Sequence, residues 1–245
     1  MIKRLVNWIV NHLTSKPVLK LLSLFISSDI IKGASRVGLD DFRVLEIIYN
    51  PVLPFDKFIV QSSQFLSEIH DRHYLLDGIL HSQYSVLKKP INFVSLGGGV
   101  TDYSGYYMDD ITIIDNNPNF NKHILSLSTR RIIADIKTID FTDYLEDVNL
   151  VEATGLFEYF TTDEIEDTLK RLRPVLDKKG FTIVISLLTD KAPKSFLRRM
   201  LGDVLHFRNE TFWKVMLIMT LGKLQFATCR TYNGSVEYIV ARKGE

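Results

Sequence analysis

Two short apolar runs, each ending in residues suited to holding a cofactor, are the most informative part of this chain. The first, Ile91–Leu96, is followed at once by Gly97, Gly98 and Gly99, and the second, Ile111–Asp115, ends in a carboxylate. Parallel strands in an open α/β sheet bind ligands beyond their carboxyl ends, where glycine lets a cofactor approach the backbone. A carboxylate that ends the neighbouring strand can accept hydrogen bonds from ribose hydroxyls. The pattern therefore predicts a site for a nucleoside-containing cofactor.

Composition limits the class of protein and its compartment. The 245 residues are 46% hydrophobic and 24% charged, as in an ordinary globular protein. The formal net charge of +1 provides no general attraction to nucleic acid, although residues 1–36 contain six basic side chains and a single acid. One cysteine, Cys229, excludes an internal disulfide and fits a reducing compartment. Because no segment approaches the roughly 18 apolar residues that cross a bilayer, and no cleavage site follows the N-terminal apolar run, we expect a cytoplasmic protein.

The chain changes its pattern near Pro90. Apolar residues recur at helical spacing through most of residues 1–89, which we expect to form an N-terminal helical cap. Helical patterns cover Val37–Tyr49 and Phe55–Leu87, and we expect the longer helix to bend or break near residues 70–77. Beyond Pro90, short apolar runs alternate with polar or helical stretches, as in a parallel sheet with crossover helices.

The second part of the chain contains signals for five parallel strands, two helices and a hairpin. The strands are expected at residues 91–96, 111–115, 131–134, 148–153 and 181–187, and an apolar helix at residues 212–221. Thr161 and Glu164 fit a capping box, which predicts a helix from about Thr162 to Leu176. Asn-Gly at residues 233–234 lies between two runs rich in β-formers, 223–231 and 235–242, and so predicts an antiparallel hairpin.

With these elements in place, the stretch from Ile91 to Arg242 resembles the class I S-adenosylmethionine-dependent methyltransferases. Five segments carry the resemblance, in the order of the family: Val94-Ser95-Leu96-Gly97-Gly98-Gly99, Ile113-Ile114-Asp115-Asn116, Ala134-Asp135-Ile136, residues 151–159 and the C-terminal hairpin. The resemblance implies an α/β fold, namely a Rossmann-like, doubly wound sheet of seven strands that ends in an antiparallel hairpin. It also implies a cofactor-binding domain of residues 90–245, with residues 1–89 as a cap or lid.

The same resemblance implies S-adenosylmethionine as the cofactor and S-adenosylhomocysteine as its product. In the family, the glycine turn passes under the methionine part, the acid that ends the second strand binds the ribose, and the residues after the third strand bind the adenine. The loop after the fourth strand faces the methyl group. The cofactor-binding residues implied in this chain are Gly97, Gly98, Gly99, Asp115, Asn116, Asp135, Ile136, Thr154 and Gly155.

The implied activity is transfer of a methyl group to an oxygen or nitrogen of a small-molecule acceptor. Since the sulfonium already activates the methyl group, the enzyme mainly orients donor and acceptor. A base is needed only for a protonated amine or an un-ionised hydroxyl, and the candidates are Glu158, Tyr159 and His206. A structural hydrogen bond is the alternative role for His206.

One position departs from the family pattern. Many members have an acid two residues before the first glycine, where it helps to hold the ammonium group of the cofactor, and here that residue is Ser95. A hydroxyl supplies no charge. Asp102, beyond the turn, is interpreted as a helix N-cap, with compensation for Ser95 as the alternative.

Two other kinds of site fit the sequence less well. A dinucleotide fingerprint on Gly97 and Gly99 needs a small residue at position 102, where Asp102 would also repel a pyrophosphate. Histidines at positions 70, 73 and 81, with Asp77, have spacings that metal ligands can have, but a solvated polar helix face explains them more simply.

Three alternatives to an enzyme with a small-molecule acceptor are less favoured. A nucleic-acid substrate is disfavoured because residues 90–245 are mildly acidic, whereas phosphate binding needs clustered Lys and Arg. A non-catalytic binding or scaffold protein with this fold is supported by Ser95 and opposed by Asp115 and Asp135, because strand-end acids have little structural purpose. A membrane-associated lipid methyltransferase depends only on the basic N-terminal arm, for which the lid interpretation is preferred.

Overall fold

The computed structural model describes residues 47–48, 51–87, 90–98, 103, 108–118, 129–192 and 205–244. Most of the predicted cap lies outside these residues, as do Gly99 and Asp102. The chain divides into two compact units, one of residues 1–77, 189–205 and 230–236, the other of residues 78–188, 206–229 and 237–245. The predicted division between residues 89 and 90 stays a prediction, because the first 46 residues are not described.

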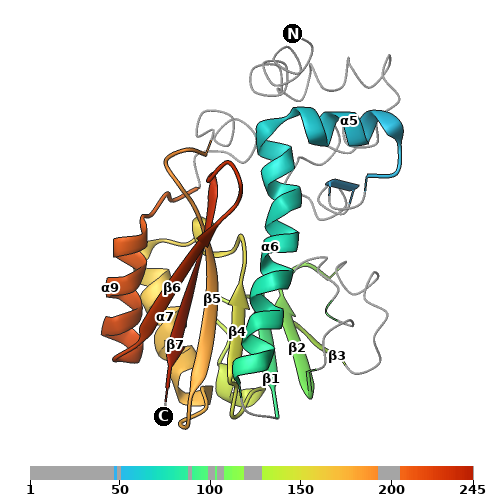
Figure 1. The fold of residues 1–245 in the computed structure, drawn as a ribbon. Helices are drawn as coiled ribbons and strands as arrows, with labels where there is room; N and C mark the ends of the chain where they lie inside the picture. Colours follow the sequence, from blue (N-terminus) through green and yellow to red (C-terminus); the bar gives the residue numbers. More distant parts are fainter. Residues whose placement is uncertain are drawn as a thin grey trace. The chain divides into compact units, whose positions relative to one another are not determined.

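A seven-stranded sheet, which lies almost entirely in the second unit, has the order β3-β2-β1-β4-β5-β7-β6 (Figure 1). Its strands are β1 (Asn92–Leu96), β2 (Asp110–Asp115), β3 (Thr129–Ile133), β4 (Leu150–Ala153), β5 (Phe181–Leu188), β6 (Gln225–Arg230) and β7 (Val236–Lys243). The pairs β1–β2, β2–β3, β1–β4 and β4–β5 are all parallel. The strand order therefore reverses between β1 and β4, which is the switch point where doubly wound sheets bind ligands.

The predicted strands are confirmed to within two residues at each end. The structure begins β4 at Leu150 instead of Val148, because Val148 makes only an isolated parallel bridge to Leu176. The C-terminal hairpin turns where Asn-Gly predicts it. Gly234 has a φ of +77°, and its amide donates to the carbonyl oxygen of Thr231 at 2.9 Å.

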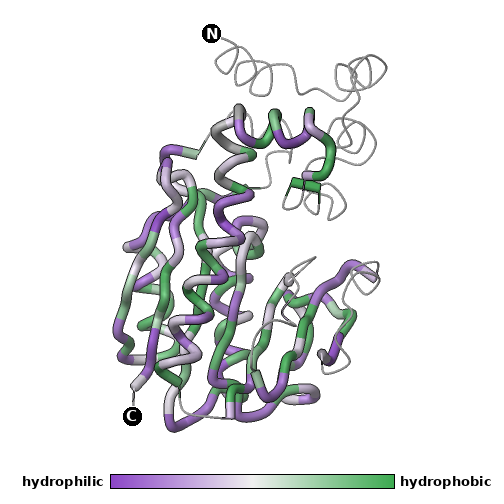
Figure 2. The backbone as a smooth tube through the Cα atoms, turned by 45° about the vertical axis from the view of Figure 1, so that its right-hand side comes forward, coloured by the Kyte–Doolittle hydropathy of each residue, from purple (hydrophilic) through white to green (hydrophobic). Residues whose placement is uncertain are grey.

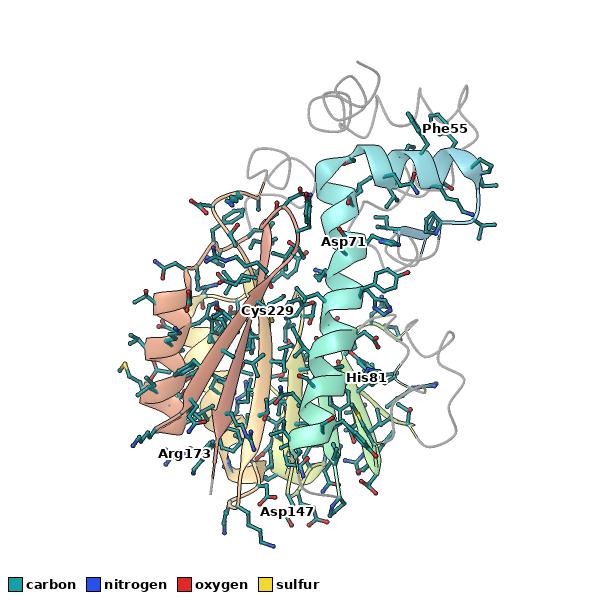
Figure 3. The ribbon with its side chains drawn as sticks, viewed as in Figure 1. Phe55, Asp71, His81, Asp147, Arg173 and Cys229 are labelled. Atoms are coloured by element: carbon teal, nitrogen blue, oxygen red, sulfur yellow. The ribbon has the colours of Figure 1, made fainter. Side chains whose placement is uncertain are left out.

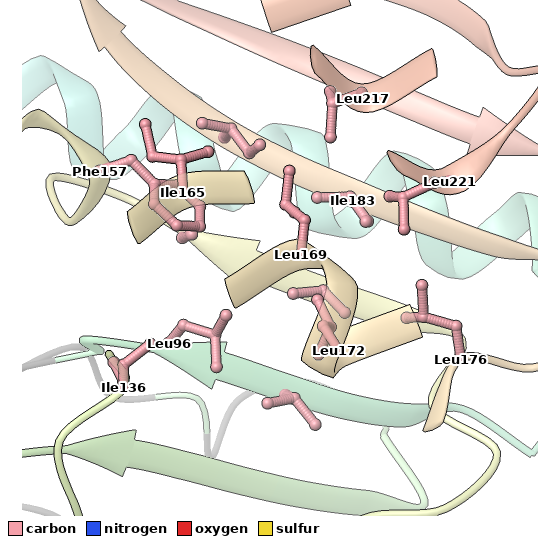
Figure 4. Packing of buried hydrophobic residues seen from close by; sticks show 14 of the residues in the cluster. Leu96, Ile136, Phe157, Ile165, Leu169, Leu172, Leu176, Ile183, Leu217 and Leu221 are labelled. Atoms are coloured by element: carbon pink, nitrogen blue, oxygen red, sulfur yellow. The ribbon is translucent and has the colours of Figure 1, made fainter. Parts of the chain in front are cut away.

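The core lies between the sheet and two helices, α7 (Thr162–Leu172) and α9 (Glu210–Leu221), of the same unit (Figure 4). The predicted capping box is present in full at the start of α7. This helix ends at Leu172 instead of 176, because Pro174 cannot donate an intrahelical bond and the chain continues as a short 3-10 helix, Arg173–Val175. Hydrophobic residues run along the strands (Figure 2), as expected for parallel strands covered by helices.

Shortening a side chain in this core should destabilise the fold. Leu169 of α7 is fully buried, so Leu169→Ala is expected to lower the free energy of unfolding by about 2–5 kcal/mol. Urea denaturation measures the change. Met219→Ala on α9, where the side chain is 77% exposed, should change it by less than about 0.5 kcal/mol. Equal losses in the two variants would contradict this account of the core.

The break predicted within the helix at Phe55–Leu87 occurs at a different place. The structure has α5 (Pro54–Ser62) and α6 (Gln64–Val86), and α6 continues through residues 70–77 without interruption. The break lies at Ser63, which has an extended conformation (φ −90°, ψ 116°) and whose buried hydroxyl accepts a bond from the Leu66 amide at 3.3 Å. Ser63 thus ends one helix and caps the next. Residues 70–77 contain neither proline nor glycine, so nothing there breaks the helix.

The single cysteine is only partly buried. Cys229 lies on the edge strand β6 and is half-buried (Figure 3). Burial raises the pKa of its thiol, and the Glu237 carboxylate acts in the same direction. The thiol is therefore protonated at neutral pH and less reactive than an exposed cysteine.

Candidate functional site

The turn after β1 disfavours a side chain at two of its glycines, at Gly97 through its backbone conformation and at Gly98 through a close contact. Gly97 has a φ of +68°, and a Cβ there would lie 3.1 Å from Cδ1 of Leu156. A Cβ on Gly98 would lie 2.4 Å from Oγ of Ser95 and 3.0 Å from Cγ2 of Ile113. Real Cβ atoms essentially never come within 3.0 Å of another heavy atom. Glycine at both positions therefore lets the backbone itself form the surface at the end of β1.

The two predicted carboxylates lie at the ends of the next two strands. Asp115 ends β2 and is half-buried, and Asp135 follows β3 and is exposed. The parallel register brings these strand ends to the edge of the sheet that Gly97 occupies: the Gly97 amide donates to the carbonyl of Ile114 at 2.8 Å, and the Ala134 amide to that of Asp115 at 3.1 Å. The structure thus assembles the three predicted features along one edge.

Both carboxylates also have local structural roles, which sequence reasoning missed. Oδ1 of Asp115 accepts a bond from the Asn117 amide at 2.8 Å, and Oδ1 of Asp135 accepts one from the Lys137 amide at 2.9 Å. Each side chain therefore closes an Asx turn. The expectation that strand-end acids have little structural purpose is wrong for both. Asn116, between Asp115 and its turn partner, is exposed.

An arginine that sequence analysis did not select holds the loop after β3. Arg171 of α7 donates to the carbonyl oxygens of Ile136 at 3.1 Å, Lys137 at 2.7 Å and Ile139. The side chain of Ile136 is buried in the core, so only its backbone is available at the edge of the sheet. A basic residue in the last turn of a helix is a weak sequence signal, because it equally fits the helix dipole.

The loop after β4 is tied to β5 by a serine. Gly155 has a φ of +69°, and its amide donates to Oγ of Ser186 at 2.8 Å. The Ser186 hydroxyl donates in turn to Oε1 of Glu158 at 3.3 Å, and both side chains are buried. The buried hydroxyl of Thr154 makes no hydrogen bond within the described part of the chain. These residues form a polar group at the carboxyl ends of β4 and β5.

The segment before α9 is hydrogen-bonded to this loop. The backbone amide of His206 donates to the carbonyl oxygen of Glu158 at 2.7 Å, and its side chain is exposed. Arg208 donates to the carbonyls of Phe157, at 3.1 Å, and Phe160. Burial lowers the pKa of Arg208, and the nearby Glu158 carboxylate opposes that change, so the guanidinium stays charged beside the acid.

The third predicted base has a different environment. Tyr159 is half-buried and packs against the hydrophobic core that α7 and α9 cover. The structure therefore brings Glu158 and the backbone of His206 together and places the Tyr159 ring against apolar neighbours. The catalytic roles of all three stay predictions.

A buried carboxylate lies beside the serine that replaces the family's acid. Ser95 and Glu152 are direct partners in the parallel pair of β1 and β4, and Oγ of Ser95 donates to Oε2 of Glu152 at 2.6 Å. The hydroxyl of Tyr103 lies 2.9 Å from the same carboxylate oxygen and 3.0 Å from Oγ of Ser95. Sequence analysis missed Glu152 and Tyr103, because neither has a local signal that links it to Ser95.

The other residue patterns do not form sites in the described part of the chain. Within it, no group of three His, Cys, Asp or Glu side chains is placed to bind a metal ion. On α6, Nδ1 of His70 lies 3.4 Å from Oδ1 of Asp71, and burial lowers the pKa of His73. None of the described helices is long and apolar enough to span a membrane.

A cavity of about 290 Å³ lies at the opposite edge of the sheet. It is lined by Phe181 at the start of β5, Lys243 at the end of β7 and Arg173, which Figure 3 labels. The parallel strands begin at this edge, whereas ligands of doubly wound sheets bind where the strands end. The cavity is therefore separate from the glycine turn and the two strand-end carboxylates.

The strand order, the parallel register and the C-terminal hairpin allow the fold to be compared with known folds. The chain has the fold of the S-adenosylmethionine-dependent methyltransferases, which confirms the predicted fold class. No family model matches the sequence, and no curated protein matches it either.

Three solved structures illustrate the similarity. A possible exported protein from Bordetella parapertussis has a TM-score of 0.64 and 15% identity, over 92% of this chain and 87% of that one. Magnesium protoporphyrin IX methyltransferase (ChlM) from Synechocystis, with bound SAH, has a TM-score of 0.59 and 11% identity, over 80% and 91% of the two chains. The plantazolicin methyltransferase BpumL, also with SAH, has a TM-score of 0.55 and 14% identity, over 82% and 95%.

Proposed function

We propose that this protein transfers a methyl group from S-adenosylmethionine to a small-molecule acceptor. The observation that carries the proposal is the convergence of the glycine turn with Asp115 and Asp135 at the carboxyl ends of three neighbouring strands. This edge of a doubly wound sheet is where nucleoside cofactors bind. The solved structures of similar fold that contain SAH support the same cofactor.

The residues present fit such a cofactor. Gly97 and Gly98 expose backbone for the methionine part, and Asp115 offers a half-buried carboxylate for ribose hydroxyls. The Asp135 carboxylate and the backbone of Ile136 are assigned to the adenine, in a loop that Arg171 holds. Thr154 and Gly155 follow β4 and are assigned to the methyl side. Gly99 and Asn116 complete the predicted cofactor set.

The proposed reaction requires the protein mainly to orient the methyl donor and the acceptor. The bound cofactor supplies an electrophilic methyl group, so an acceptor held in line is enough unless it must first lose a proton. For such an acceptor we assign proton removal to Glu158. Its side chain lies in the loop after β4, is buried and accepts a hydrogen bond from Ser186. His206 and Tyr159 are the other candidates.

The small-molecule class of the acceptor is part of the proposal. The similar structures include methyltransferases named for magnesium protoporphyrin IX and for plantazolicin, and these names describe only those proteins. We infer that the acceptor is a small molecule, that the enzyme is cytoplasmic and that residues 1–89 form a lid. The low net charge of the chain agrees with a small-molecule acceptor. Whether oxygen or nitrogen is methylated depends on the acceptor.

Calorimetric titration with S-adenosylmethionine and S-adenosylhomocysteine tests the proposal. We expect micromolar binding to the wild type and a loss of about 10- to 100-fold in Asp115→Ala, because ribose hydrogen bonds to a carboxylate are charge-assisted. Asp177→Ala is the matched control: Asp177 is also half-buried, and its Oδ1 accepts a backbone bond two residues on at 2.8 Å, at the opposite edge of the sheet.

The control separates the two roles of Asp115. A loss of affinity in Asp115→Ala alone supports a cofactor site, whereas equal losses in both variants mean that removing an Asx turn weakens the fold. No binding to the folded wild type would contradict the proposed function. The non-catalytic scaffold would then be the better interpretation, since both strand-end acids already have structural roles.

A further inference from the structure

A buried carboxylate faces the glycine turn from the strand next to β1. Glu152 of β4 and Ser95 of β1 are 1% and 0% exposed, and their register places both side chains on the same face of the sheet. A Cβ on Gly98 would lie 2.4 Å from Oγ of Ser95, so this hydroxyl faces the turn. The pair also lies between β1 and β4, where the strand order reverses.

The hydrogen bonds of this group concentrate on one carboxylate oxygen. The hydroxyls of Ser95 and Tyr103 donate to Oε2 of Glu152 at 2.6 and 2.9 Å, and the Tyr103 ring is held against Phe93 with ring centroids 4.9 Å apart. Among the described residues, no basic side chain forms an ion pair with Glu152. Burying a carboxylate without a cation costs free energy, so a positively charged group bound nearby would stabilise Glu152.

We propose that Glu152 supplies the negative charge that holds the ammonium group of the cofactor, in place of the acid that related proteins carry at position 95. The inference rests on the proposed function. Ser95 donates its proton to Glu152 and so keeps both lone pairs of Oγ for the ammonium. Donation to a carboxylate also makes that oxygen a stronger acceptor. Glu152 is thus a positioning residue that acts through Ser95, and Tyr103 fixes its orientation.

The test compares two ligands that differ only in the ammonium group. S-Adenosylhomocysteine carries it, and 5′-deoxy-5′-(3-carboxypropylthio)adenosine lacks it. In calorimetric titrations of the full-length protein, we expect Glu152→Gln to bind S-adenosylhomocysteine about 10- to 100-fold more weakly than the wild type. The desamino ligand should bind to both proteins with affinities within about threefold. A role in sheet stability alone would weaken both ligands equally, and that result would overturn the proposal.

Two further variants make the result decisive. Ser95→Ala removes the hydroxyl without adding volume, and we expect the same selective loss, so the proposal is testable even if Glu152→Gln fails to fold. Glu237→Gln is the control, because Glu237 is a buried carboxylate on β7 and should affect neither ligand. If the wild type binds S-adenosylhomocysteine but does not prefer it to the desamino ligand, this inference fails and the proposed function stands. If the wild type binds neither ligand, the proposed function itself fails.

Discussion

Gly98→Ala is expected to lower the affinity for S-adenosylhomocysteine by at least about tenfold and the free energy of unfolding by about 1–3 kcal/mol. The new Cβ would lie 2.4 Å from Oγ of Ser95 and 3.0 Å from Cγ2 of Ile113. Both are side-chain atoms of buried residues in the middle of the parallel sheet, and Oγ of Ser95 is held by its hydrogen bond to Glu152. We therefore expect the turn to shift away from its strand, and the surface that it offers to the cofactor to move with it.

Calorimetric titration and urea denaturation of the same preparation measure the two effects. Gly78→Ala on α6 is the matched control, because no atom lies within 4 Å of the Cβ it would gain. In a helix this substitution should leave affinity unchanged and stabilise the protein by up to about 1 kcal/mol. Wild-type affinity in Gly98→Ala would show that the turn after β1 does not contact the ligand.

Glu158→Gln is expected to reduce kcat by about 10²- to 10⁴-fold once a methyl acceptor that must lose a proton is in hand. The amide keeps the size of the side chain and can still accept the bond from Ser186, but it cannot take a proton. Because Glu158 is not among the residues assigned to the cofactor, the affinity for S-adenosylhomocysteine should change by less than about twofold. Single-turnover kinetics with a saturating acceptor measures the chemical step directly.

A surface glutamate provides the control for this second prediction. Glu166 of α7 forms an exposed pair with Lys170 at 2.6 Å, so Glu166→Gln should leave both kcat and ligand affinity unchanged. Undiminished turnover in Glu158→Gln would exclude this residue as the base and direct attention to His206→Gln and Tyr159→Phe. A fall in both kcat and ligand affinity would instead indicate that Glu158 supports the structure of the loop after β4. The backbone of Glu158 already has such a role, because its carbonyl oxygen accepts a hydrogen bond from the His206 amide.

Local patterns predicted most of the fold because their physical causes are local. Largely apolar runs, such as Phe181–Leu188, are what a parallel strand covered on both faces requires. The capping box at Thr161 and the Asn-Gly turn before Gly234 satisfy their own backbone groups within a few residues. Patterns of this kind carry the same information in any tertiary context, and so they were confirmed.

The wrong predictions have equally specific causes. The break between α5 and α6 depends on Ser63, whose hydroxyl caps a helix in the absence of proline or glycine. The expectation that Asp115 and Asp135 have little structural purpose is wrong, because each closes its own turn through a backbone amide two residues on. In both cases a short polar side chain competes for the backbone, and a search for apolar periodicity does not detect this.

The order of the strands along the chain, the glycine turn, and the acids that end β2 and follow β3 can all be predicted from residues that are neighbours in sequence. Which strands pair, and therefore which side chains meet, depends on the folded sheet. Ser95 and Glu152 are 57 positions apart, and it is the parallel register of β1 with β4 that places a buried carboxylate beside the serine. Ser186 and Arg208 likewise reach the loop after β4 only through the folded sheet. Contacts between distant residues depend on strand order and register, and the spacing of residues along one chain does not specify either.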